Sequence, residues 1–400
     1  MCSLQLNFSD RPGFRAAILC STIVFYGGKM GQLFLWTNRV DDELRDRFLK
    51  RFGFEIPESL LELYENLPEE IHKFFGFISL EDIVEEEERS PRMMPGLVPF
   101  AKEENGDRFC FYRSLQEGEP VSIGVWMHET NHFLPITDKM HLFMHWWISK
   151  ETIDCFGDED WPEIKKILEI VQASCGIEQF DVFSAPAFYP LSWHQEMNRL
   201  DPVNPFTLTF LSATQFALLG YDAAINNLRN SQKVMPHYGA PYIWEARLQA
   251  MRGNISEAHH AYWRHMSVPI FINGYHYWWQ WGDLQIPELS EVESLSFMRQ
   301  AEISPPAEIL RKRKIEMLID GDIEDYSQRM ELSRKLLTEG DLNASLAEMS
   351  NALFLAAWDG SAMKKVLPNL AELYDRARRG CERDQCERAT HKLEKTAVSV

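Results

Sequence analysis

Cysteine is scarce in this chain of 400 residues, which has seven cysteines scattered along its length. Small secreted domains instead carry a dense, even-numbered set that forms a disulfide framework. Cys381 and Cys386 lie close together near the end, but no second pair completes a zinc site, so we expect free thiols. This cysteine usage indicates a reducing compartment, and we expect a cytoplasmic protein.

Long hydrophobic runs are also missing. No stretch reaches the roughly 18–20 apolar residues that a membrane span needs, so we expect no integral membrane protein. The run Ala16–Tyr26 follows Arg11 and Arg15 as in a signal peptide, but Gly-Gly-Lys stands where the cleavage site would be. We interpret residues 1–39 as a leader that is disordered, or that is not translated if synthesis begins at Met30.

Positive charge is in deficit. The chain has 41 Lys and Arg against 60 Asp and Glu, and residues 41–150 alone hold 23 acidic residues against 12 basic ones. Such a field repels phosphate backbones and anionic lipid, and it attracts basic protein surfaces. We therefore expect a protein partner, no nucleic acid and no membrane.

Motifs for phosphate binding and nucleophilic catalysis are absent. The sequence contains no G-x-x-x-x-G-K-[ST], no G-x-G-x-x-G and no G-x-S-x-G. The acidic turns 158–160 and 320–322 lack the pattern of a calcium loop. We therefore predict no cofactor and no catalytic residue.

The remaining composition, 45% hydrophobic and 25% charged, is that of a folded protein. A chain of this length exceeds what one hydrophobic core organises, so we expect several domains. We predict an α+β domain over 40–150, a connector with one helix over 151–204, an all-α helical-repeat domain over 205–380 and a frayed polar tail over 381–400.

The expected α+β domain begins with apolar residues at helical spacing, which predict helices at 41–52 and 56–64. Short apolar runs separated by turn-forming residues then predict a small sheet. These runs are Phe77-Ile78, Leu97–Phe100, Phe109–Tyr112 and Val121–Trp126. The stretch Met140–Ile148 returns to helical character and would cover one face of the sheet.

Residues 85–88, four consecutive glutamates, form the sharpest charge run. Such a block is typical of a solvated loop or a frayed helix end. The functional alternative is a docking edge for a basic partner. The binding residues that we predict are Glu85, Glu86, Glu87, Glu88, Asp107 and Trp126.

The helical part contains an internal repeat. Ala224 and Ala258 stand 34 residues apart, which is the period of tetratricopeptide repeats. In such repeats a small residue lets two antiparallel helices approach each other closely. A third candidate at 340–352 keeps the internal spacing but not the phase. We predict a degenerate, tetratricopeptide-like array.

Aromatic residues concentrate at 275–281, between the second and third candidate repeats. Such a cluster is typical of packing between helix pairs, since large aromatic side chains dominate core burial. The alternative is a surface that stacks on a peptide or a sugar.

Five segments of the α+β region occur in an order and spacing that resemble the SUKH superfamily. They are Ile56–Tyr64, Phe77–Ile83, Gly96–Ala101, Asn105–Phe111 and Pro120–Glu129. That superfamily includes bacterial toxin-immunity proteins and fungal regulators of cell-wall synthesis. The resemblance implies a compact α+β fold that binds other proteins, in many relatives a toxin domain, and it implies no catalytic residue.

A competing signal is H-E-x-x-H, formed by His128, Glu129 and His132. In zinc hydrolases this motif lies on a helix, which brings both imidazoles to one metal while the Glu activates water. The β-branched run before it and Pro135 after it predict a strand and a loop instead. In that conformation the two imidazoles would diverge.

Three functions are compatible with these features. The first is a non-catalytic module that binds a protein partner. It would act either as an immunity-type protein that neutralises a basic toxin domain or as a regulatory scaffold. The second is a zinc hydrolase that uses His128 and His132. The third is a structural scaffold in which the α+β domain anchors the repeats. The partner's identity and the oligomeric state stay open.

Overall fold

The computed structural model describes residues 25–26, 29–30, 42–67, 69–86, 89–115, 121–155, 161–174, 198–266, 268–272 and 326–398. Of the expected leader over 1–39, it describes only β1 (Phe25–Tyr26) and β2 (Lys29–Met30), which pair antiparallel. The aromatic cluster at 275–281 lies outside the described residues.

Four short helices precede the main sheet. They are α1 (Asp42–Phe52), α2 (Glu58–Asn66), α3 (Glu69–Phe74) and α4 (Leu80–Glu85). The prediction of helices near 41–52 and 56–64 is confirmed. Helix α1 buries Leu44, Phe48 and Phe52, which recur at helical spacing on one face. Helix α4 begins at Ser79, whose hydroxyl accepts a hydrogen bond from the backbone N–H of Asp82 at 3.1 Å.

The sheet has four antiparallel strands in the order β3-β4-β5-β6. They are β3 (Leu97–Lys102), β4 (Arg108–Tyr112), β5 (Ser122–Trp126) and β6 (Phe133–Thr137). The prediction missed β6, and Phe77 makes only an isolated bridge to Ala101. At the β5–β6 pairing the position of Gly124 requires glycine, because an added Cβ would lie 2.0 Å from the carbonyl oxygen of Leu134.

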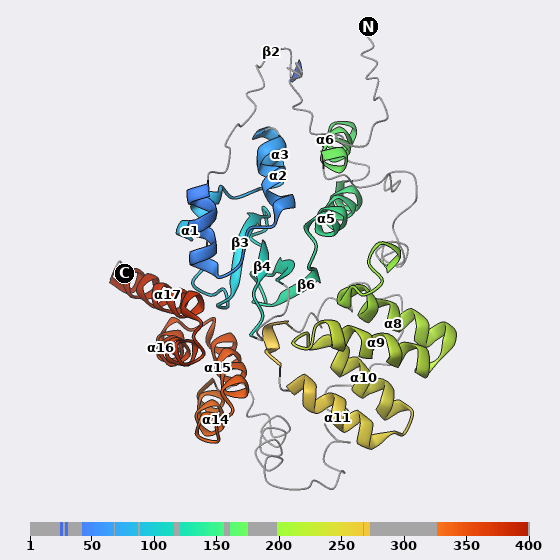
Figure 1. The fold of residues 1–400 in the computed structure, drawn as a ribbon, viewed down its shortest axis with the longest axis vertical. Helices are drawn as coiled ribbons and strands as arrows, with labels where there is room; N and C mark the ends of the chain where they lie inside the picture. Colours follow the sequence, from blue (N-terminus) through green and yellow to red (C-terminus); the bar gives the residue numbers. More distant parts are fainter. Residues whose placement is uncertain are drawn as a thin grey trace.

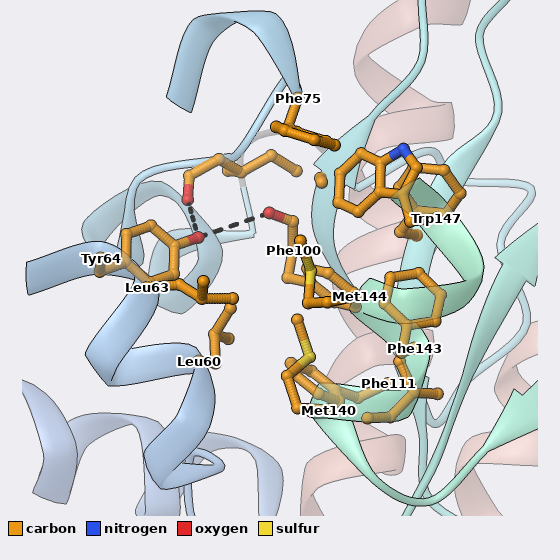
Figure 2. Close-up of a cluster of buried hydrophobic side chains, with 14 of the residues drawn as sticks. Leu60, Leu63, Tyr64, Phe75, Phe100, Phe111, Met140, Phe143, Met144 and Trp147 are labelled. Carbon is orange, nitrogen blue, oxygen red and sulfur yellow. Dashed lines mark hydrogen bonds between the residues drawn. The ribbon is translucent and has the colours of Figure 1, made fainter. Parts of the chain in front are cut away.

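One face of the sheet packs against α5 (Met140–Cys155) and the first helices, as Figure 2 shows. Trp147 of α5 lies edge-on against Phe109 of β4, with ring centroids 4.2 Å apart. The Tyr64 hydroxyl lies within hydrogen-bond distance of the carbonyl oxygen of Ile78 and, at 3.4 Å, of that of Phe100 in β3, which ties α2 to the sheet (Figure 2). The predicted cover of one face is therefore confirmed. The domain boundary expected at residue 150 falls inside α5.

After α6 (Trp161–Ser174), the described chain is all-helical. The helices are α8 (Pro205–Leu219), α9 (Tyr221–Val234), α10 (Ala240–Met251), α11 (Ile255–Met266), the 3-10 helix η1 (Ile270–Ile272), α14 (Tyr326–Thr338), α15 (Leu342–Ala356), α16 (Gly360–Arg376) and α17 (Gly380–Val398). Consecutive helices pack side by side, α8 on α9, α10 on α11, α14 on α15 and α16 on α17. Ala224 and Ala258 are fully buried.

The helices α14–α17, η1 and the segment that leads into α10 cover the other face of the sheet. Figure 1 shows α8–α11 and α14–α17 as two groups on either side of the lower part of the sheet. A second hydrophobic core unites strand residues with η1, α14, α15, α16 and α17. The strands are therefore buried on both faces, and the sheet is the central layer of the molecule.

Residues 380–398 differ from the frayed polar tail that we expected. They form α17, which packs against α16 and α1 (Figure 1). Cys386 and Ala389 of this helix are buried in the second core, and Leu393 packs against it. The expectation was wrong because few apolar side chains suffice when polar ones find partners at the interface.

Candidate protein-binding site

The second sheet face is an apolar surface that the helices cover. It consists of the strand side chains that belong to the second hydrophobic core, Leu97, Cys110, Tyr112, Trp126 and Phe133. Their side chains alternate with those of the first core because successive strand residues point to opposite faces. All five are at most 3% exposed. In this chain the face packs against the chain's own helical region.

Glu86 lies at the edge of this face, where α4 ends. Its backbone adopts a left-handed conformation (φ 56°), and its N–H donates to the carbonyl oxygens of Asp82 and Ile83, which closes the helix. The turn directs the Glu86 side chain inward, and the residue is only 4% exposed. A buried carboxylate is stable only where cations and hydrogen-bond donors surround it.

Helix α17 supplies those donors. Arg388 Nε donates to Glu86 Oε2 at 2.6 Å, and Gln385 Nε2 donates to Glu86 Oε1 at 2.8 Å. Lys392 Nζ donates at 3.1 Å to the backbone oxygens of Glu86 and Arg89. The guanidinium of Arg51, on α1, lies 3.6 Å from Glu86 Oε2. Residues on three successive turns of α17 thus form hydrogen bonds with the end of α4.

A second set of contacts holds the beginning of α17. Gln385 Oε1 accepts a hydrogen bond from the backbone N–H of Gly96 at 2.7 Å. Arg379 Nη1 donates to the carbonyl oxygen of Ser114 at 2.6 Å. Glu382 is only 1% exposed and lies between Arg379 and Arg113, the latter at 3.7 Å. We call the two sets together, centred on Glu86, Arg89, Gly96, Arg113 and Ser114, the α17 seat.

Burial sets the electrostatics of the α17 seat. Loss of hydration lowers the pKa of the Arg89 guanidinium, while the neighbouring Glu86 opposes that change. Arg89 keeps its place because its Nη2 donates to the carbonyl oxygens of Met93 and Met94 at 2.9 and 2.8 Å. Burial also raises the pKa of the Cys386 thiol, so this side chain stays neutral.

The structure separates the binding residues that we predicted. Glu86 lies in the α17 seat, whereas Glu85 forms an exposed ion pair with Arg47 of α1. Glu87 and Glu88 lie outside the described residues. Trp126 is 3% exposed and donates from Nε1 to Asn131 Oδ1 at 2.8 Å, so it packs inside the molecule instead of presenting a free surface.

The H-E-x-x-H motif lies at the β5–β6 turn, and Asp107, directly before β4, lies beside it. Residues 127–132 form this turn and not a helix. Asp107 Oδ1 lies 2.8 Å from His128 Nδ1, whereas the ring of His132 is buried against Phe354 of α15 with centroids 4.8 Å apart. The two imidazoles therefore have separate partners on separate elements. Within the described ranges, no group of three His, Cys, Asp or Glu side chains is placed to hold a metal ion.

Prediction from sequence missed the α17 seat. Its helix carries Glu382, Cys386, Ala389 and Leu393 at spacings of four, three and four residues, which place them on one face. That spacing is the signal that could have identified a docked helix. We read the segment as a tail because charged residues outnumber apolar ones in it.

Residues 39–144 match the SMI1 / KNR4 family (SUKH-1). We call residues 39–144 the SUKH-1-like domain. The match covers about a quarter of the chain, and it ends inside α5. No curated protein matches the chain. Among the helices that the structure describes, none is long and apolar enough to cross a membrane.

Proposed function

We propose that the chain is a non-catalytic protein-binding scaffold, in which the SUKH-1-like domain seats the C-terminal helices and the assembled helices receive a protein partner. The observation that carries this proposal is the occupied α17 seat, where the buried Glu86 accepts from Gln385 and Arg388. The family is known for immunity-type and interaction domains, which supports the general role.

The same observation favours a scaffold over a toxin-neutralising clamp. A basic toxin would need a free acidic surface, and Glu86 is already compensated by cations of this chain. Trp126 and the rest of the second sheet face are also covered. A partner in trans would bind elsewhere, or it would first have to displace α17.

The helical region supports the scaffold as a repeat array. Helices that follow one another in the chain pack against each other, and the expected small residues Ala224 and Ala258 are fully buried. Arrays of this kind expose extended surfaces suited to protein binding. We propose that α8–α11 and α14–α17 are degenerate tetratricopeptide-like repeats.

Cross-linking mass spectrometry of the full chain, purified with the proteins bound to it, tests the proposal. The scaffold predicts partner cross-links to the helices α8–α16, while cross-links within the chain still join Lys392 to the SUKH-1-like domain. A partner linked at the α17 seat, with the links of Lys392 lost, would favour the clamp. A chain that binds no protein at stoichiometric amounts would contradict both.

A further inference from the structure

A polar cleft of about 300 Å³ lies between α9 and α11, with α10 as its floor. Helix α9 contributes Arg229 and Lys233, and helix α11 contributes His260 and Arg264. Pairs four residues apart lie one helical turn apart on one face, so both helices direct a basic row into the cleft. The cleft is remote from the α17 seat and plays no part in it.

The two carboxylates of the cleft already accept hydrogen bonds from side chains of this protein. Glu245 rises from the floor, is 5% exposed, and accepts from Arg229 Nε and from Gln232 Nε2, both at 2.6 Å. Glu257 accepts from Arg229 Nη2 at 3.1 Å. Arg229 therefore pairs with both carboxylates, and the hydrogen bond to Glu245 raises the pKa of Arg229.

Among the residues that the structure describes, neither Lys233 nor Arg264 has a carboxylate partner. Both are exposed, and in the described part of the chain Lys233 has only a 3.5 Å contact with the neutral Asn230. They follow the Arg229–Glu257 pair towards the C-terminal ends of α9 and α11, at the same end of the cleft. This end carries two positive charges, and the lining of the cleft has three Lys and Arg against two Glu.

The charge of the surrounding helices also favours a negatively charged ligand. Residues 205–272 hold five Lys and Arg against three Asp and Glu, in a chain whose net charge is −19. Exposed cations held on rigid helices attract carboxylates, and a hollow of this size is at the lower end of binding pockets. A partner recognised here has the opposite charge to the basic toxin that the acidic composition suggested.

We propose that the α9–α11 cleft binds an acidic segment of a partner protein, whose carboxylates pair with Lys233 and Arg264. The inference rests on the proposed scaffold function and names the chemistry of its partner. It assigns recognition to the helical region instead of the SUKH-1-like domain.

Fluorescence anisotropy with the full chain tests the cleft. The probe is a short fluorescein-labelled peptide in which glutamate alternates with serine, and its control has glutamine in place of glutamate. We expect the glutamate peptide to bind at least about tenfold more tightly, and Lys233→Glu or Arg264→Glu to weaken it by a similar factor. Added salt should weaken binding further, since the groups are exposed.

The matched control is Lys166→Glu, which makes the same charge change on an exposed residue of α6. It should leave peptide binding within about twofold of the wild type. Thermal melting of each variant reports whether it remains folded. Equal binding by Lys233→Glu and Lys166→Glu would overturn the proposal.

Further outcomes would also overturn it. If neither peptide binds, Lys233 and Arg264 only complement the C-terminal ends of their helices. Free glutarate that competes as well as the peptide would assign the cleft to a small anion, and a dimer of the wild type that Lys233→Glu dissociates would assign it to a second copy. In each case the α17 seat, and with it the scaffold proposal, would still stand.

Discussion

Single residues in this protein show how local backbone geometry decides the use of a sequence motif. Asn131 takes a left-handed conformation (φ 59°), and its side chain accepts the indole N–H of Trp126. Asparagine adopts this conformation more readily than other residues that have a Cβ. Asn131 therefore stabilises a β5–β6 turn in which His128 contacts Asp107 and His132 contacts Phe354.

Asn131→Ala should destabilise the protein by about 1–3 kcal/mol, because alanine is strained at this φ and the bond to Trp126 is lost. Asn131→Gly is the matched control, since glycine loses the bond without the strain and should cost only about 1 kcal/mol. Urea unfolding measures both. If residues 128–132 formed the helix of a zinc hydrolase, Asn131→Ala would stabilise instead, because alanine is the better helix former.

The buried thiols make a prediction about pH. Burial raises the pKa of Cys110 and of Cys386 in the folded protein, while the unfolded thiols ionise near pH 8.5, at about their usual pKa. Above that pH the folded state binds more protons than the unfolded state, so stability is present below it and falls as the pH rises.

Between about pH 8.5 and pH 10, each thiol should contribute a loss of up to about 1.4 kcal/mol of unfolding free energy per pH unit. Cys386→Ala should reduce the slope by that amount, and urea unfolding at a series of pH values measures it. An unchanged slope in Cys386→Ala would mean that this thiol is not buried in the folded protein.

At the scale of elements, prediction succeeded where the apolar residues of a segment follow one clear pattern, either helical spacing or a short strand-like run. Helix α1 and the strands β3, β4 and β5 have clear patterns, and the prediction placed them within a few residues. Strand β6 was missed because Pro135 interrupts a run that is otherwise strand-like. Helix α17 was missed because its stability comes from polar contacts with residues almost 300 positions earlier, such as Gln385 to Glu86.

Hydrogen exchange of the full chain tests whether α17 depends on its seat. Arg388→Glu places a second carboxylate beside Glu86, and exchange of α17 amides should become at least about tenfold faster, which corresponds to about 1.4 kcal/mol of opening free energy. Arg383→Glu is the control on the same helix, because Arg383 is 38% exposed and its acidic partners among the described residues are exposed too. Equal exchange in the two variants would show that α17 does not rely on Glu86.

At the scale of the whole molecule, the sheet joins two cores into one structure. Residues facing α5 form the first core and residues facing the C-terminal helices form the second. Composition and periodicity predicted an α+β region followed by helices, but not that the second region covers the first. The sequence of a strand does not identify the segment that covers it. A strand buried on both faces reads as a continuous apolar run, whichever segment packs against it.

Links outside the second core support this arrangement. Arg92 lies over the ring of Trp358 at 4.5 Å, and Ser114 Oγ lies 3.0 Å from His237 Nδ1. Asn204 Nδ2 donates to the carbonyl oxygen of Ile136 at 2.9 Å. Each helical group is thus connected to the SUKH-1-like domain by polar as well as apolar contacts, which fits a scaffold with fixed geometry.

The central claim is that the SUKH-1-like domain seats the C-terminal helices of its own chain, and a double-mutant cycle on Glu86→Gln and Arg388→Gln tests it most directly. Urea unfolding of the full chain, the two single variants and the double variant gives the coupling energy. The α17 seat predicts a coupling of about 1–3 kcal/mol, because the pair is largely desolvated and hydrogen-bonded. Additive single effects, with no coupling, would mean that Glu86 and Arg388 do not meet in the folded protein.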